Sequence, residues 1–433
     1  MLSSRLPKDL SPSPFFAELE RAKADVLAEC AEANSLPFID MTVSSPVKAG
    51  LPVDLDDAVD EGRKAFGYWN PDASGWKSAR EAVVEYYRER GGNFTAGQII
   101  LTASTSEAYS VLFKTFCDPG DVILTPMPGY PLLDTLAQLE HLECAPYFLK
   151  LKRERFDKLT DLKKVTERRS APAEVNAFRF VLDSDSLLAA PEHAKILLLV
   201  SPHNPTGHCV SREEWNEAVR FCEENNMILV VDEVFGDYAF TDKVSRTWQY
   251  VLDEGHPNLW DAGGGDFINL PEDGPKCPIF WLNGLSKAVG SPQLKLGWMA
   301  FYAPRENFEE IRAALEFVED AYLSVSAPAQ ALGSSLLKHS EAYESKVLDR
   351  LQQNWQTLRE AFPSKYCPEV LGGWYAVVRL GEDDEELTLR LLREKHVLVQ
   401  PGFFFDFDED GWVVMSLLQD PAIFKEAIQR IKQ

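Results

Sequence analysis

The chain has 433 residues, 45% of them hydrophobic, which is enough for two domains with large buried cores. Its formal net charge of −24 argues against nucleic acid or an anionic membrane as a partner. The seven cysteines form no C-x-x-C pair and the seven histidines form no recognisable metal set. These features, and the lack of an apolar run near the ~18 residues that span a membrane, predict a cytoplasmic protein with reduced thiols and no metal.

The N-terminal segment predicts an arm, a helix and a short strand. Residues 1–13 are rich in serine and proline, and helical spacing of apolar residues follows from Pro14 to Asn34. The stretch Ile39–Pro46 reads as a strand that ends in a turn containing Ser44 and Ser45.

A loop with Tyr68 precedes an amphipathic helix over Ser78–Arg90, and a strand over Ile99–Thr102 then leads to a second helix that ends at Phe116. Ser104, Thr105 and Ser106 stand at the start of that second helix. Hydroxyls and free backbone N–H groups at a helix start favour an anion site, although they are also ordinary N-caps.

The middle of the chain gives weaker signals. A strand over Asp121–Thr125 precedes the turn that carries Tyr130, which on its own reads as a core aromatic. Residues Phe148–Ala194 are polar and irregular, and no motif is found there. Ser211 and Glu214 predict a capping box that opens a helix.

Three apolar runs are followed by polar residues. The runs Lys195–Val200, Met227–Val231 and Ile279–Leu282 lead to Asn204, Asp232 and Lys287, respectively. In an open parallel sheet these side chains meet outside the carboxyl ends of the strands. Apolar and small neighbours lower the pKa of the lysine toward that of a nucleophilic amine. An amine, a carboxylate and an amide suit a protonated pyridine cofactor held as an imine.

The rest of the chain predicts a surface insertion over Trp248–Gly274 and then a change to α+β character. Long helices, strands around Trp374–Val378 and Trp412–Leu417, and a final helix follow. We expect residues 1–46 to form an arm and part of a small domain, 47–304 a large domain and 305–433 the rest of the small domain.

With Asn204, Asp232 and Lys287 in this order and at these separations, the sequence from about Ile39 onward resembles the fold-type I aminotransferases, which use pyridoxal 5'-phosphate (PLP). The resemblance implies an α/β fold whose large domain has a mainly parallel sheet flanked by helices, with a smaller α+β domain. It further implies that Lys287 forms the internal aldimine, that Asp232 pairs with the pyridinium nitrogen and that Asn204 hydrogen-bonds the ring hydroxyl.

Other roles rest on the same resemblance. The residues that would hold the cofactor phosphate are Ser104, Thr105 and Ser106 together with Lys295, and Tyr130 would stack on the ring. Tyr68 would reach the cofactor phosphate of a partner subunit in a homodimer, although it is equally well explained as plain packing. Ser44 and Ser45 would line the substrate site, or would simply belong to a strand that crosses between the domains.

Four positions depart from the family pattern. Phe235 stands where a tyrosine usually donates to the ring oxygen, so we expect a raised internal aldimine pKa. Lys295 replaces an arginine and Gly284 a serine or threonine, both of which bind phosphate in relatives. Val414 replaces the arginine that grips the substrate carboxylate, and the next arginine is Arg430.

The leading interpretation is a PLP-dependent aminotransferase that moves an amino group between an amino acid and a 2-oxo acid, with Lys287 shuttling the proton. The alternative is a PLP-dependent lyase or decarboxylase on the same scaffold. A sensor domain of a transcription regulator is disfavoured because the chain has no room for a winged helix. A catalytically inactive binding protein is disfavoured because Lys287, Asp232, Asn204 and Tyr130 are all present.

Overall fold

The computed structural model of the protein describes residues 3, 5–7, 9–31, 36–54, 56–67, 70–155, 176–241, 244–253, 274–323, 325–381 and 383–433. Tyr68 and most of the predicted insertion at 248–274 lie outside the described residues.

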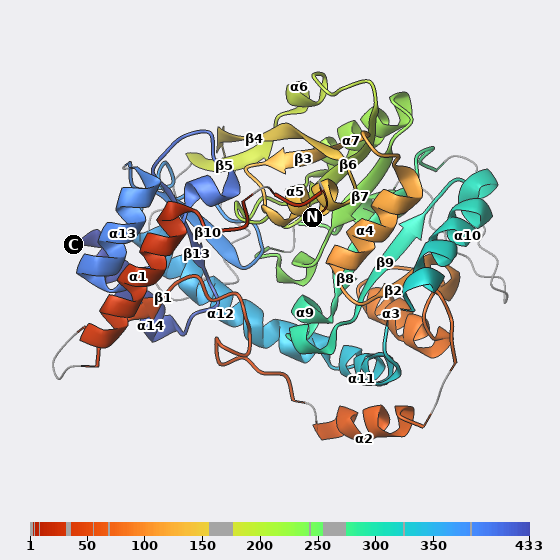
Figure 1. The fold of residues 1–433 in the computed structure, drawn as a ribbon, viewed down its shortest axis with the longest axis horizontal. Coiled ribbons are helices and arrows are strands. Elements are labelled where there is room, and N and C mark those ends of the chain that lie inside the picture. Colours follow the sequence, from red (N-terminus) through yellow and green to blue (C-terminus); the bar gives the residue numbers. More distant parts are fainter. Residues whose placement is uncertain are drawn as a thin grey trace.

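A mainly parallel sheet of eight described strands organises the larger part of the molecule (Figure 1). The strands are β2 (Ile99–Thr102), β3 (Val122–Met127), β4 (Glu143–Arg155), β5 (Asn176–Leu182), β6 (Ala194–Val200), β7 (Ile228–Asp232), β8 (Ile279–Gly284) and β9 (Gly297–Tyr302). Their order is β2-β9-β8-β7-β6-β3-β4-β5, and β8, β7, β6, β3 and β4 run parallel. Every residue of β2, β8 and β9 is buried, which requires cover on both faces. The α/β fold predicted from the sequence is confirmed.

Helices connect and cover these strands. They are α2 (Asp56–Ala65), α3 (Lys77–Glu89), α4 (Thr105–Phe116), α5 (Leu132–Leu139), α6 (Ser184–Leu187), α7 (Arg212–Glu224), α8 (Thr247–Asp253) and α9 (Leu285–Ala288). The predicted capping box of α7 is present, since Ser211 accepts from the Glu214 N–H at 3.2 Å and Glu214 accepts from the Ser211 N–H at 2.7 Å.

A second, antiparallel sheet lies at the left of Figure 1. It consists of β10 (Tyr375–Arg379), β13 (Trp412–Ser416) and β12 (Gln400–Pro401), in the order β10-β13-β12. Nearby, β1 (Ile39–Asp40) pairs in parallel with β11 (Val397–Leu398). The N-terminal segment therefore folds back onto the C-terminal part of the chain.

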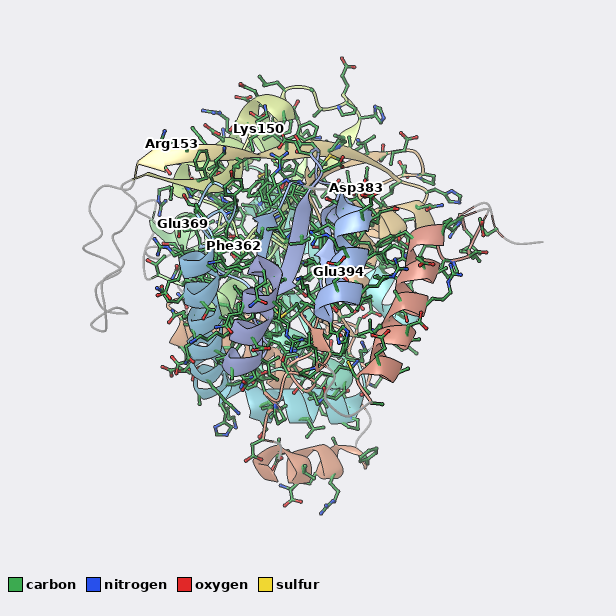
Figure 2. The ribbon with its side chains drawn as sticks, turned by 90° about the vertical axis from the view of Figure 1, so that its left-hand side faces the viewer. Lys150, Arg153, Phe362, Glu369, Asp383 and Glu394 are labelled. Carbon is green, nitrogen blue, oxygen red and sulfur yellow. The ribbon has the colours of Figure 1, made fainter. Side chains whose placement is uncertain are left out.

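Helix α1 (Pro14–Glu29) packs against α13 (Asp384–Lys395) and so holds the N-terminal segment on the C-terminal part of the chain. Figure 2 shows α1 beside α13, which runs from near the labelled Asp383 to Glu394. Their shared apolar cluster includes Phe15, Leu19 and Leu392, all buried. Burial of each such side chain contributes roughly 1.5–3 kcal/mol.

Three further helices and a terminal one complete the fold: α10 (Arg305–Tyr322), α11 (Ala327–Leu337), α12 (Ser340–Ala361) and α14 (Pro421–Lys432). Helix α10 packs against α4, α11 against α2 and α3, and α12 against α14. The domain boundary near residue 305 stays a prediction, because α10 and α11 lie on the helices that precede it in the chain.

Two predictions of local structure need correction. The strand expected over Ile39–Pro46 is limited to Ile39–Asp40, because turns begin at Met41. The stretch Phe148–Ala194 is not irregular throughout, since β4 and β5 pair antiparallel from Leu149–Leu182 to Arg155–Asn176. This ribbon lies at the sheet edge, where polar side chains remain in solvent and hide the apolar pattern.

No helix within the described ranges is long and apolar enough to cross a membrane. Those same ranges contain no group of three or more histidine, cysteine or acidic side chains that could hold a metal ion. All seven cysteines are described, and each is a free thiol.

Candidate active site

Three neighbouring parallel strands bring the predicted polar residues to one edge of the large sheet. Asp232 is the last residue of β7, Asn204 follows β6 and Lys287 follows β8. The loop after β6 is tied to β7 by a hydrogen bond of 2.9 Å from the Ser201 N–H to the Asp232 carbonyl. The convergence predicted from the sequence is thus present at the carboxyl ends of β6, β7 and β8.

Lys287 lies in α9, where aromatic rings surround its amine. Its Nζ is 4.6 Å from the centre of the Trp374 ring and 5.3 Å from that of Phe235. The Tyr238 hydroxyl donates to the Lys287 carbonyl at 2.6 Å and so fixes the backbone. Burial lowers the pKa of Lys287 to about 8, although the Asp232 carboxylate opposes this shift. A lysine amine with this pKa is available as a nucleophile near neutral pH.

Asp232 is a carboxylate held in place by two donors. The Tyr109 hydroxyl donates to its Oδ2 at 2.7 Å, and the Val234 N–H donates to its Oδ1 at 3.0 Å. Burial nevertheless raises the pKa of Asp232 above its usual range, despite these two donors and Lys287. A buried carboxylate is stabilised by a positively charged partner, which a protonated pyridine nitrogen supplies.

Asn204 presents an unused polar atom at the same edge. Its Oδ1 is buried and has no hydrogen-bond partner within the described part of the chain. Rotation of the Asn204 amide about its Cβ–Cγ bond presents either the oxygen acceptor or the NH2 donor at this position. Buried polar atoms are normally paired, so this atom is available to a bound polar group.

The start of α4 lies beside these strands. The Ser104 hydroxyl caps the helix by accepting from the Glu107 N–H at 3.2 Å. The N–H groups of Thr105 and Ser106 occupy the first two helical positions, which have no acceptor within the helix. A Cβ on Gly297 would lie 3.2 Å from the Thr105 nitrogen, so the bare glycine lets β9 approach the helix start. The free N–H groups of this helix start suit a phosphate, and its assignment as the phosphate site stays a prediction.

The backbone around Gly284 leaves little room for a side chain. A Cβ there would lie 3.0 Å from the Gly297 Cα and 3.1 Å from the Leu296 carbonyl oxygen. A serine or threonine at this position would therefore force β8 and β9 apart. The close approach of the two strands therefore favours glycine at position 284.

Two other predicted cofactor residues lie at the periphery. Lys295 is exposed and adopts a left-handed backbone conformation, with φ of 53°, just before β9. Tyr130 follows β3 and is 47% exposed. It lies near enough to Tyr375 to raise the pKa of that phenol, together with the larger effect of burial.

The predicted substrate residues separate in the structure. Ser44 hydrogen-bonds Tyr375, whose ring centre is 6.0 Å from that of Phe235. Ser45 instead accepts from the Lys48 N–H at 3.5 Å, within its own turn. Ser44 is therefore connected to the aromatic residues near Lys287, whereas the hydroxyl of Ser45 serves the local turn.

Val414, where the family resemblance implies an arginine, is an apolar residue of the second sheet. Val414 is buried in β13 and pairs with Val377 of β10. Arg430 does not compensate, because its Nη1 donates to the carbonyls of Pro37 at 2.7 Å and Lys395 at 3.1 Å. Arg430 therefore links the N-terminal segment, at Pro37, to the end of α13, at Lys395.

The sequence did not identify Tyr109, Trp374 or Tyr375 as site residues. Tyr109 lies on the inward side of an amphipathic helix, where an aromatic usually indicates core packing. Tyr375 is the first residue of β10 and Trp374 directly precedes it, more than 80 residues after Lys287. The Gly372–Gly373 pair before them was the available signal, since paired glycines indicate a close backbone approach.

Comparison with known proteins identifies the family of the chain. A family model for class I and II aminotransferases matches residues 44–431. The chain is 24% identical over 416 residues to the glutamate-pyruvate aminotransferase AlaA of Haemophilus influenzae, covering 92% of this chain and 91% of that protein. It is 25% identical over 418 residues to an alanine aminotransferase of Mycobacterium tuberculosis, covering 92% and 86% of the two chains.

The fold agrees as well. The solved structure of an alanine aminotransferase from Pyrococcus furiosus superposes with a TM-score of 0.74 at 20% identity and covers 98% of both chains. An aspartate aminotransferase double mutant from Thermus thermophilus gives a TM-score of 0.74 at 19% identity, covering 100% of this chain and 99% of that one. The chain therefore belongs to the class I and II aminotransferases and is a PLP-dependent enzyme that transfers amino groups.

Proposed function

We propose that Lys287 is the residue that carries PLP and moves the proton during transfer. The observation that supports this assignment best is a lysine with a pKa of about 8 at the end of β8, next to the buried carboxylate that ends β7. When bound, PLP draws electrons away from the substrate's α-carbon. Lys287 then acts as base and acid at that carbon, for which a pKa near neutrality is favourable.

The other residues position the cofactor in this proposal. Asp232, oriented by Tyr109, holds the pyridine nitrogen in its protonated form. Asn204 binds the ring oxygen and Tyr130 covers a face of the ring. The phosphate is bound by the start of α4, through the N–H groups and hydroxyls of Thr105 and Ser106 next to the Ser104 cap, with Lys295 adding positive charge.

The proposed substrates are an amino acid and a 2-oxo acid. Relatives named for alanine, for glutamate and pyruvate, and for tyrosine support this substrate class without naming the donor. Since Val414 cannot bind a carboxylate ionically, neutral donors such as Ser44 and Tyr375 hold this group in our proposal. Their hydrogen bonds are weaker than those of a bidentate arginine.

We also propose a cytoplasmic homodimer. Large apolar side chains are exposed on or next to α2 and α10, including Phe66, Phe317 and Leu323. Light scattering of the purified protein tests this proposal, with a mass of about twice 48.7 kDa expected; a monomer at micromolar concentration would contradict it.

The experiment that tests the activity is an absorbance scan of the purified protein with a panel of amino acids and amines. Conversion of bound cofactor to pyridoxamine phosphate, reversed by a 2-oxo acid, is expected and names the donor. Release of ammonia or carbon dioxide without that conversion would instead support a lyase or a decarboxylase. The apolar Val414 is the observation that favours this second candidate.

A further inference from the structure

Trp374 has a buried indole N–H group for which the described residues offer no acceptor. The residue is 0% exposed, so water does not reach it. Its Nε1 has no hydrogen-bond partner in the described ranges. Leaving a buried donor unpaired costs roughly 1–3 kcal/mol. An acceptor that arrives with a bound molecule would remove this penalty.

The position of the indole ring is fixed from two sides. On the backbone, the Gly373 N–H donates to the Tyr238 carbonyl at 2.9 Å, and the Leu417 N–H donates to the Trp374 carbonyl at 2.8 Å. On the ring, the centres of Tyr238 and Phe235 lie at 5.2 and 5.4 Å. Trp374 is therefore presented to the site as a rigid group and cannot easily turn to another acceptor.

The segment before Trp374 packs against both loops that carry the cofactor residues. The Leu371 N–H donates to the Gly207 carbonyl at 2.9 Å, in the loop that contains Asn204. A Cβ on Gly372 would lie 2.8 Å from the Tyr238 carbonyl oxygen, in the loop after Asp232. The second sheet thus delivers the indole against the ends of β6 and β7.

An unpaired indole alone would not indicate a ligand, and Trp248 illustrates this point. Its Nε1 is also buried without an acceptor in the described residues, but the rings around it are Tyr87 and Phe94. Trp374 differs because the Lys287 amine lies 4.6 Å from its ring. A molecule joined to that amine therefore has its first atoms near the Trp374 ring.

We propose that the Trp374 N–H donates a hydrogen bond to the ring oxygen of PLP, and so takes the part that Phe235 cannot play for lack of a hydroxyl. This proposal rests on the proposed role of Lys287. The ring oxygen is attached next to the carbon that the lysine joins, so it is the cofactor's acceptor closest to the Lys287 nitrogen. With Asn204, Trp374 gives this oxygen a second donor.

The consequence is electrostatic. A donor to the ring oxygen withdraws negative charge from it and weakens its attraction for the proton on the lysine nitrogen. Trp374 therefore lowers the pKa of the lysine–cofactor linkage, which opposes the rise expected from Phe235. Loss of the indole N–H should raise this pKa by about one unit, corresponding to a single hydrogen bond to a charged acceptor.

The test compares Trp374→Phe with Trp248→Phe, since each change removes one buried indole N–H and keeps an aromatic ring. The absorbance of bound PLP is titrated with pH in the absence of any amino acid, and the dissociation constant of PLP is measured. We expect Trp374→Phe to raise the midpoint by about one pH unit and to weaken PLP binding about tenfold. Trp248→Phe should match the wild type in both.

An NMR readout checks the contact without mutation. The indole N–H resonance of Trp374, assigned through the variant, should move downfield when PLP is added to the apoenzyme. The proposal is overturned if the absorbance midpoint of Trp374→Phe equals that of the wild type, or if the midpoints of both variants shift equally. It is also overturned if the midpoint of Trp374→Phe changes only when an amino acid is present. That last result would assign the indole to the substrate carboxylate. Failure of the wild type to show a lysine-linked cofactor band would refute the proposed function instead.

Discussion

Replacing Tyr109 by phenylalanine isolates the contribution of one hydrogen bond to cofactor binding. The hydroxyl donates to Asp232 Oδ2 at 2.7 Å, and the ring is only 3% exposed, so the variant keeps the packing and loses the bond. A hydrogen bond to a charged group contributes roughly 1.5–3 kcal/mol. Without it, the pKa of Asp232, which burial already raises, moves further up. The carboxylate is then less able to keep the pyridine nitrogen protonated.

We expect Tyr109→Phe to weaken PLP binding at least about tenfold, since 1.4 kcal/mol corresponds to a factor of ten. The loss should grow as the pH falls, because protonation of Asp232 removes its charge. Equilibrium dialysis of apoenzyme with PLP at several pH values measures both effects.

Tyr147→Phe is the matched control for this experiment. Its hydroxyl is equally buried but donates to the Leu198 carbonyl at 2.9 Å, on β6, and not to Asp232. Its loss should lower stability and leave PLP binding unchanged. Equal PLP affinity in Tyr109→Phe and the wild type, or an equal loss in both variants, would refute the reasoning.

Three other predictions concern the lysine, a close strand contact and a buried ion cluster. The rate of PLP incorporation into the apoenzyme, measured by stopped-flow absorbance, should increase as the pH rises through about 8, where Lys287 loses its proton. A rate that increases only near pH 10 would mean that Lys287 has the pKa of an ordinary lysine. Gly284→Ser should lower the free energy of unfolding by about 1–3 kcal/mol in urea titrations, because its Cβ would lie 3.0 Å from the Gly297 Cα, and an unchanged midpoint would contradict this. Asp237→Asn should destabilise the fold by about 3–5 kcal/mol, because Asp237 is bound by Arg90, Arg246 and the Tyr86 hydroxyl. Burial raises the pKa of Asp237, but Arg246 and Arg90 lower it below its usual value. The stabilisation from Asp237 is therefore present above about pH 4 and is lost as the pH falls further. If the stability of Asp237→Asn falls with acid as steeply as that of the wild type, this reasoning is wrong.

The central sheet was predictable because its strands are buried on both faces. The runs before Asn204, Asp232 and Lys287 are continuously apolar, and the structure places them in β6, β7 and β8 in the expected parallel order. The ribbon of β4 and β5 was missed because an edge pair exposes polar side chains and gives no comparable pattern.

The site was predictable only where its residues follow a strand or open a helix. Asp232, Lys287 and the start of α4 fall in this class. Trp374 and Tyr375 could not be assigned, because their place depends on how β10 docks on two loops far away in the sequence. The packing reason for Gly284 also emerges only from the approach of β8 to β9.

The most direct test of the account is to locate the lysine that holds PLP. The purified enzyme is reduced with borohydride, digested and analysed by mass spectrometry for a pyridoxyl group. We predict the group on Lys287 and its loss, with the cofactor absorbance, in Lys287→Ala. A pyridoxyl group on another lysine, Lys295 first among them, would contradict the assignment on which the proposed roles of Asp232, Asn204 and Trp374 depend.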